Sequence, residues 1–384
     1  MLTGIAALKA TVWSRLYHAY GRAIDTPEHL RALLREDSES REKAMEHLWH
    51  AVIHQGTAWT ATGPAALVVA GLLSDERLDR GEPVRAELLS FLTHVAKAPK
   101  NAETSLEELR RMAAFDIGPL IDSGEDDALY GVDDAGMSFF ARSILGCIEA
   151  APELFKVMWE NLSHDDPRVR TTAAMGTVAL AKIEPLGQKA KEIEERLLHL
   201  AENAKNPDER SAFVLAMGEV GFSPFGFLDD PSPAVRMCAA LAPSLASHPA
   251  AIDELLQALE NHAGEIDEWF QVTPPQFHVR PRFFLVGRLV GEVKDFDRLV
   301  DAAIAVLQVT EKYCVDYDWG PLLAAAFPAG DGRIETEAQC RFLDALVKKR
   351  RLWDPSFGNA SLWFQRAGLP EDRRACAKLV KKAK

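Results

Sequence analysis

The 384-residue sequence predicts an all-α fold of stacked helices, and three observations support this class. Three segments, beginning at Asp166, Asn206 and Pro231, repeat one pattern in which a proline stands three residues before an arginine and an apolar helix follows. No apolar–polar alternation bounded by hairpin turns stands out. Hydrophobic residues make up 47% of the chain, enough for a continuous core. A repeated helix start of this kind implies a solenoid, which usually offers a binding surface.

The physical logic of the pattern is clearest in the unit that begins at Asp166. Asp166 is placed to accept hydrogen bonds from the unpaired amides of a new helix. Pro167 suits the first helical position, where its missing N–H would have no partner anyway. Small residues such as Ala173 and Gly176 then allow a neighbouring helix to approach closely.

An Asp-Pro-x-Val-Arg start followed by Ala-Ala-x-x-Gly resembles the second helix of HEAT repeats, whose unit is about 40–47 residues. The resemblance rests on three proline–arginine pairs: Pro167 and Arg170, Pro207 and Arg210, Pro233 and Arg236. It implies a HEAT-like α-α superhelix in which these residues are structural and the arginines tie neighbouring turns together. Weaker versions occur at Glu82–Arg85, at Ser40–Arg41 and, without the proline, at Arg142. The alternative is a non-repeating helical domain with ordinary capped helices.

Helical spacing of apolar residues predicts the first elements in chain order. We expect helices over 5–22, from Thr26, over 40–54, from Pro64, over 83–97 and from Ser105. The helix from Pro64 is apolar throughout and is expected to be buried. The acidic segment 121–134 lacks the ligand spacing of a calcium loop and is predicted to be a solvated loop, with metal binding as the alternative.

The domain organisation follows from one break in the helical pattern. Residues 1–262 are predicted to form the HEAT-like solenoid. Residues 263–282 form an irregular loop, because three prolines prevent a regular helix. Residues 283–384 continue as helices over 283–292 and 296–310 and end in a helical cap. The cap carries Trp353, Phe357, Trp363 and Phe364. The two helical parts can equally form one continuous domain.

Composition indicates a cytoplasmic protein. The longest apolar run has 11 residues, whereas a membrane-spanning helix needs about 20. No secretory signal is evident, and the five cysteines form neither a CxxC pair nor a disulfide framework.

Charge is unevenly distributed along the chain. Residues 341–384 hold 12 basic and 4 acidic groups, whereas the other 340 residues hold 32 and 53, a net charge of −21. The acidic body favours a cationic partner and disfavours nucleic acid. The basic end suits a solvated helix terminus, with a nucleic-acid or lipid contact as the alternative.

Several catalytic motifs are absent from the sequence. It contains no GxxxxGK[ST], GxGxxG, HExxH or GxSxG motif, and no His-Glu dipeptide. We therefore expect no enzymatic activity, no metal and no cofactor.

Two groups of residues are candidates for contact with a partner. The first comprises His50, His54, Gln55 and Trp59, next to His47, because His47, His50 and His54 would share one helix face. Zinc binding by these histidines and packing between repeats are the alternatives. The second group mixes aromatic and acidic residues on irregular segments, as binding hot spots do. It comprises Trp269, Phe277, Tyr317, Asp318 and Trp319, with burial as loop anchors as the alternative.

The sequence thus predicts a non-catalytic scaffold or adaptor that binds a protein with a basic surface. By analogy with bacterial repeat proteins encoded beside toxins, that partner could be a toxin and this chain an immunity-type inhibitor. The alternatives are a HEAT-like DNA glycosylase or another nucleic-acid enzyme, and a repeat-type lyase or chaperone for a covalently attached pigment. We expect Trp59→Ala and Trp319→Ala to preserve helicity and weaken partner binding.

Overall fold

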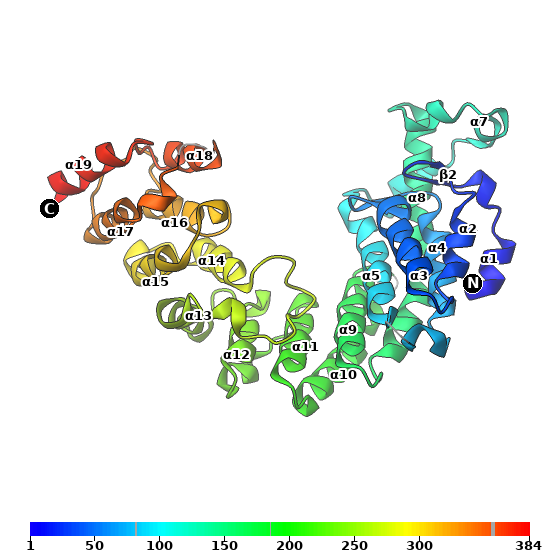
Figure 1. Ribbon diagram of the computed structural model, residues 1–384, viewed down its shortest axis with the longest axis horizontal. Helices are drawn as coiled ribbons and strands as arrows, with labels where there is room; N and C mark the ends of the chain where they lie inside the picture. The colour runs from blue at the N-terminus through cyan, green and yellow to red at the C-terminus, as the bar shows by residue number, and fades with distance from the viewer. Residues whose placement is uncertain (81–82, 185, 355–357) are drawn as a thin grey trace. The chain divides into compact units, whose positions relative to one another are not determined.

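The computed structural model describes residues 1–80, 83–184, 186–354 and 358–384, and these residues form 19 α-helices (Figure 1). The chain divides into two compact units, Met1–Arg196 and Leu197–Lys384. The division falls within α10 (Ala190–Asn203). Segment 263–282 therefore lies inside the second unit.

The first unit is built around two long helices, α5 and α8. Helix α8 packs against α4, α5, α6 and α9, and α5 also packs against α9. The helices of this unit are α1 (Gly4–Ala10), α2 (Thr26–Ala32), α3 (Ser38–His47), α4 (Thr62–Leu72), α5 (Arg85–Asn101), α6 (Leu106–Ala113), α7 (Gly118–Ser123), α8 (Asp134–Asn161) and α9 (Pro167–Ala181).

The second unit packs its helices in chain order, mostly in two rows. One row runs α13–α15–α17–α19 and the other α14–α16–α18, with cross-contacts between the rows (Figure 1). The helices are α11 (Pro207–Glu219), α12 (Pro233–Ala240), α13 (Pro249–His262), α14 (Pro281–Glu292), α15 (Phe296–Val309), α16 (Trp319–Ala326), α17 (Glu337–Lys348), α18 (Gly358–Arg366) and α19 (Arg373–Ala383).

Five arginines at helix starts make a common contact with the turn that precedes the helix. Each reaches the residue six positions earlier, and in four of them the acceptor is the backbone carbonyl. The pairs are Arg41–Arg35, Arg170–His164, Arg210–Ala204 and Arg236–Asp230, with Arg85 binding the Asp79 carboxylate instead. These carbonyls lie where the preceding helix or turn ends and would otherwise lack partners.

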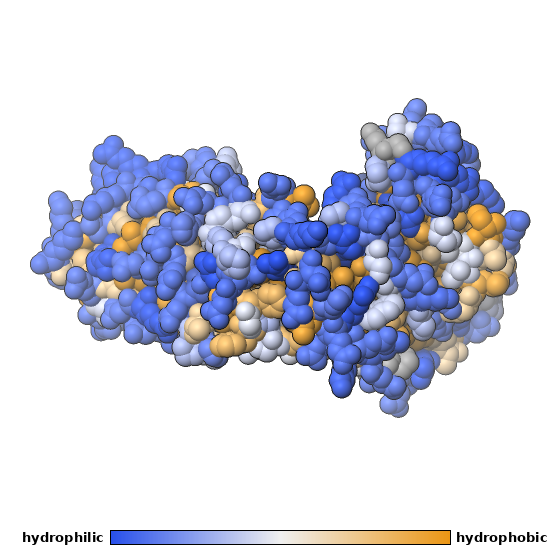
Figure 2. Space-filling view, turned by 90° about the horizontal axis from the view of Figure 1, so that it is seen from below, coloured by the Kyte–Doolittle hydropathy of each residue, from blue (hydrophilic) through white to orange (hydrophobic). Residues whose placement is uncertain are grey.

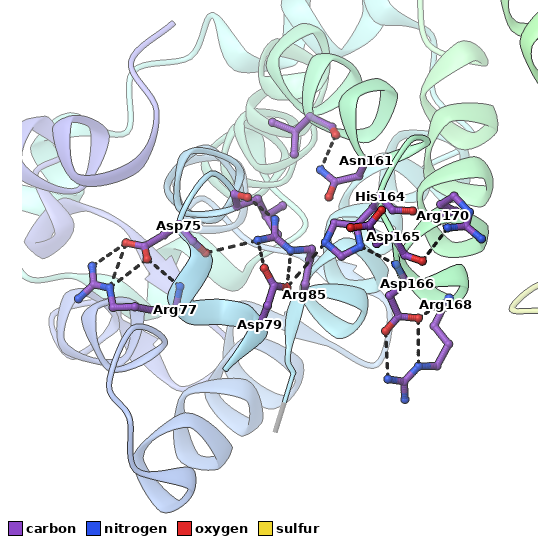
Figure 3. Close-up of polar contacts among 12 residues, drawn as sticks. Asp75, Arg77, Asp79, Arg85, Asn161, His164, Asp165, Asp166, Arg168 and Arg170 are labelled. Carbon is purple, nitrogen blue, oxygen red and sulfur yellow. Dashed lines mark hydrogen bonds and ion pairs between the residues drawn. The ribbon is translucent and has the colours of Figure 1, made fainter. Parts of the chain in front are cut away.

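Figure 3 shows how two of these arginines are linked in the first unit. Arg85 holds Asp79 through a 2.6 Å ion pair, and the His164 ring lies 3.9 Å from the same carboxylate. Because the Asp166 amide donates to His164 Nδ1, the ring proton is on Nε2 and faces Asp79. The starts of α5 and α9, which are neighbours in space, are thereby joined.

The N-terminal segment differs from the predicted helix over 5–22. Helix α1 ends at Ala10, and the chain then forms a hairpin of β1 (Tyr17–His18) and β2 (Gly21–Arg22). A second hairpin, β3 (Ile53–His54) and β4 (Thr57–Ala58), replaces the end of the predicted helix 40–54. Its turn places Gln55 and Gly56 at positive φ. Each strand has two residues, too few for an alternating pattern.

The acidic segment 121–134 is only partly the solvated loop that the sequence predicts. Asp126 accepts hydrogen bonds from the Tyr17 hydroxyl at 2.6 Å and from Arg22 at 2.7 Å. These two donors, the arginine first, hold the pKa of Asp126 below its usual value. The segment therefore anchors the first hairpin. It also includes the end of α7 and a short 3₁₀ turn over Asp126–Tyr130.

Other predicted features agree with the structure. Helix α4 is buried, Ser105 caps α6, and the helices expected over 283–292 and 296–310 are α14 and α15. Arg142 lies in the middle of α8 and starts no helix. Glu82 and Phe357 lie outside the described residues.

Within the described residues, no helix is long and apolar enough to cross a membrane. The face drawn in Figure 2 is mainly hydrophilic, with smaller apolar areas.

Candidate functional site

A polar pocket of about 720 Å³ opens in the first unit beside α3 and the start of α5. We call it the acidic pocket. Its lining comprises Glu36, Ser38, Arg41, Glu42, Met45, Glu46, Trp49, His50, Val84 and Glu87. Helix α3 supplies Glu42 and Glu46 one turn apart, so both face the same side.

Negative charge dominates this pocket. Its four glutamates are exposed, and no hydrogen bond or ion pair to them occurs among the described residues. The buried guanidinium of Arg41 belongs to the lining but donates to the carbonyls of Arg35, Arg77 and Arg80. Four carboxylates without a hydrogen bond or ion pair therefore share the lining with one cation that the backbone already holds. Lys43 and Arg77, outside the lining, interact electrostatically with Glu46 and Glu36. The electrostatic field favours a positively charged ligand.

Trp49 and His50 add an aromatic wall to the pocket. They lie in a π-helical turn, Leu48–Val52, that continues α3. Trp49 is half-buried and packs edge-on against Phe91 and His94, with ring centroids 6.1 and 4.8 Å apart. A wall of this kind next to carboxylates suits a lysine or arginine side chain, whose charge is attracted to an indole face.

The π-helical turn separates the three histidines that the sequence places on one helix face. His50 lines the acidic pocket, whereas His54 lies in β3 and its Nδ1 pairs with the His50 carbonyl at 2.9 Å. His47 points elsewhere, toward Thr26, whose hydroxyl is 2.9 Å from Nε2. The prediction of a shared face is wrong because the π turn changes the angular spacing of residues 47–54.

Trp59, which the sequence predicts to contact a partner, is not fully exposed. It is half-buried against the cluster around Tyr17, with ring centroids 6.2 Å from Tyr130 and 6.3 Å from Phe139. Its indole Nε1 is buried and has no partner among the described atoms. Gln55 is exposed in the hairpin turn. Of the first predicted group, only His50 lines the acidic pocket.

His47 forms part of the one described cluster with atoms close enough to hold a metal ion, together with His18 and Asp25. The Tyr20 amide donates to His18 Nδ1 at 3.1 Å, so the His18 ring proton is on Nε2, 2.9 Å from Asp25 Oδ1. A metal bound at Nε2 would move that proton to Nδ1, against the Tyr20 N–H. The cluster therefore fits a hydrogen-bonded His–Asp pair better than a metal centre.

In the second unit, a cavity of about 620 Å³ brings together Phe277 and Tyr317 from the second predicted group. Tyr317 is half exposed and stacks on Phe283 with ring centroids 5.1 Å apart. Phe277 lies against Phe284, with centroids 5.0 Å apart. Segment 263–282 forms one wall of this cavity. It is fixed in place by hydrogen bonds from Val272 to Asp208 and from Gln276 to the Ala212 carbonyl.

Asp318 and Trp319 are core residues, not contact residues. Trp319 is 1% exposed and Asp318 is fully buried, so neither offers surface to a partner. The Asp318 carboxylate caps α16 through the Trp319 amide and accepts from the Thr310 hydroxyl at 2.7 Å. Trp269 is half-buried beside His262 and does not line the cavity.

Sequence reasoning did not single out Trp49 or the glutamates of the acidic pocket. The available signal was the four-residue spacing of Glu42, Glu46 and His50, with Trp49 beside them. The contribution of Val84 and Glu87 required knowing that α3 and the start of α5 are close in space.

Comparisons with protein-family models, with curated proteins and with solved structures gave no match to this chain. Functional inference therefore rests on the geometry of the chain itself.

Proposed function

We propose that the chain is a HEAT-like helical solenoid that acts as a non-catalytic protein-interaction scaffold. The two rows of sequentially packed helices and the arginine contacts at helix starts support the architecture. A surface of stacked helices offers extended area to a macromolecule.

One observation indicates that the partner is positively charged. In the acidic pocket, four glutamates without an ion pair lie next to an aromatic wall. Such a pocket accepts a lysine or arginine side chain presented by a folded protein. The partner is therefore a protein with a basic surface. A nucleic-acid-degrading toxin has such a surface, and an immunity-type inhibitor would cover it. The most specific version of our proposal is therefore that the partner is such a toxin and this chain its inhibitor.

The test compares two triple variants with the same change in charge. In the pocket variant, Glu42, Glu46 and Glu87 become Gln. In the control variant, the exposed residues Glu107, Glu149 and Glu184 of the same unit become Gln. Each tagged protein is used to capture partners from lysate of its source organism, and the bound proteins are identified by mass spectrometry.

We expect the wild type and the control variant each to capture one stoichiometric basic protein, and the pocket variant not to capture it. Equal loss in both variants would indicate long-range attraction without a pocket and would contradict the proposed site. A gel-shift assay with duplex DNA at low salt is expected to show no binding. A salt-dependent shift would instead support the nucleic-acid alternative.

A further inference from the structure

Helix α19 carries four cations on one side that the fold itself does not use. Arg374, Lys378, Lys381 and Lys382 are exposed, and no hydrogen bond or ion pair to their side chains occurs among the described residues. On a helix of 3.6 residues per turn, the four lie within about 100° of one another. The opposite side of the helix is buried against α17. We call these four residues the basic face of α19.

Other cations of α19 are already engaged, which sets the basic face apart. Lys384 lies 3.0 Å from the Asp344 carboxylate, and Arg373 donates to a backbone carbonyl of α17 at 3.2 Å. These two contacts help to hold the helix in place. The helix dipole favours cations in the last turn, but Arg374 and Lys378 lie before that turn. Their position therefore requires another explanation.

The surroundings of the basic face disfavour two kinds of anionic partner. Among the described residues of α19, no large apolar side chain is exposed, whereas a helix needs such side chains to bury itself in a lipid surface. Residues 197–340 of the same unit hold 10 basic and 22 acidic groups, so a phosphate backbone that extends beyond α19 would meet negative charge. The basic face therefore suits a compact acidic site on a folded protein.

The acidic pocket of this same chain has the complementary features. Glu42 and Glu46 are four residues apart on α3, as Lys378 and Lys382 are on α19, so each pair spans about 6 Å along its helix. Two such helices lying side by side can bring both pairs of opposite charges into register. Trp49 offers an apolar surface for the carbon chain of a lysine.

We propose that the basic face of α19 in one copy of the chain binds the acidic pocket of a second copy. The inference rests on the proposed function, because it treats the acidic pocket as a receptor for cations on a folded protein, and it goes further by naming an occupant. The two surfaces are different patches, so the contact is heterologous and leaves one pocket and one basic face free. A basic partner must then displace α19 from the pocket.

Ionic strength decides whether this contact can be observed. Each copy carries a net charge of −13, which opposes association over long distances. Salt at about 0.1 M screens charges more than about 10 Å apart, so it weakens this repulsion more than it weakens the contacting pairs. At about 1 M the screening length falls to about 3 Å, and the copies are expected to separate.

Sedimentation velocity of the purified full-length protein at several concentrations tests the proposal. The wild type is compared with the pocket variant and with two lysine variants that share one change in net charge. Circular dichroism verifies that each variant keeps its helices. In the helix variant, Lys378, Lys381 and Lys382 become Gln, and in the lysine control, the exposed residues Lys97, Lys100 and Lys156 of the first unit become Gln.

The wild type and the lysine control are expected to associate as concentration rises. The helix variant and the pocket variant should each raise the dissociation constant at least tenfold. An equimolar mixture of these two variants should associate again but stop at dimers, because only one intact pocket can meet one intact basic face. The helix variant should also capture at least as much basic partner from lysate as the wild type does.

Three results would overturn the inference: a wild type that is monomeric at every concentration, equal weakening in the lysine control, or a mixture of the two variants that stays monomeric. In a monomeric wild type, binding of labelled duplex DNA or phosphatidylserine vesicles that the helix variant lacks would assign the basic face to phosphate groups. Capture of a basic protein without self-association would leave the proposed function standing. Self-association lost in the pocket variant, with capture unchanged, would contradict the proposed function alone.

Discussion

The Arg170 guanidinium donates a hydrogen bond to the backbone carbonyl of His164, with 2.5 Å between Nη1 and the oxygen. A second bond reaches the Asp165 carbonyl at 2.8 Å (Figure 3). The side chain thus closes the turn between α8 and α9. The proline–arginine spacing of the repeated pattern follows from this geometry, because proline starts the helix and the arginine three residues later points back to the turn.

Arg170→Ala is expected to lower the free energy of unfolding by about 1–3 kcal/mol, since charged hydrogen bonds to otherwise unpaired carbonyls are lost. Among the described residues, the neighbouring Arg168 side chain pairs only with Asp166, and it is 61% exposed. Arg168→Ala should therefore change stability by no more than about 0.5 kcal/mol. Urea denaturation followed by circular dichroism measures both. Equal losses would argue against a special role for Arg170.

Gly63→Ala is expected to destabilise the protein although alanine favours helices. A Cβ at Gly63 would lie 2.4 Å from the Gly146 carbonyl oxygen, where α4 crosses α8. Backbone cannot move aside as a flexible side chain can, so a loss of about 1–3 kcal/mol follows. Gly291→Ala, where space is open, should be neutral or stabilising by up to about 1 kcal/mol. Thermal unfolding should therefore occur at a lower temperature in Gly63→Ala and at an unchanged or higher temperature in Gly291→Ala.

Helix starts were predictable from the sequence because their causes are local. Asp166, Asn206 and Ser105 each accept an amide proton of the helix they begin, as their residue types and positions indicate. The hairpins were not predictable, because two-residue strands leave no periodic signal. The π-helical turn at Leu48–Val52 was missed because apolar spacing there also fits an ordinary helix.

Candidate site residues were harder to predict, since their burial depends on distant segments. Trp319 contacts Phe364, with ring centroids 6.1 Å apart across 45 positions of sequence. An aromatic residue beside an aspartate therefore proved to be a core anchor, whereas Tyr317, two positions earlier, is half exposed. Local composition could not separate these two outcomes.

Trp319→Ala is now expected to cost about 3–5 kcal/mol of stability, because a fully buried indole is replaced by a cavity. This reverses the expectation from sequence that the substitution would spare the fold. Trp49→Ala should cost less, since that side chain is only half-buried. Urea denaturation of both variants provides the comparison. A Trp319 variant as stable as the wild type would contradict the assignment of Trp319 to the core.

The first unit should become less stable on mild acidification, and His47 is the residue responsible. Burial, and then the neighbouring His29 ring stacked 4.2 Å away, lower the pKa of His47 to about 4. Between pH 6.5 and 4 the unfolded chain therefore binds a proton that the folded chain does not, and stability falls as pH falls. His47→Gln should flatten this dependence, whereas replacing the exposed His94 with Gln should not. Urea midpoints at pH 7, 6 and 5 test the difference.

Asp318 should produce the opposite pH dependence in the second unit. Burial raises the pKa of its carboxyl group to about 6, despite hydrogen bonds from Thr310 and Trp319 and the charge of Arg282 3.5 Å away. Between pH 4 and 6 the folded state holds a proton that the unfolded state has released, so stability falls as pH rises across this window. The difference of about two pKa units corresponds to about 3 kcal/mol.

Asp318→Asn isolates this contribution, because an amide keeps an oxygen for the Trp319 N–H but does not titrate. The variant should lose the decline in stability between pH 4 and 6, even if its stability is lower overall through loss of the Arg282 ion pair. Urea unfolding followed by tryptophan fluorescence at pH 4.5, 5.5 and 6.5 measures the slope for each protein. Parallel pH profiles would place the titrating group elsewhere and leave Asp318 ionised throughout this range.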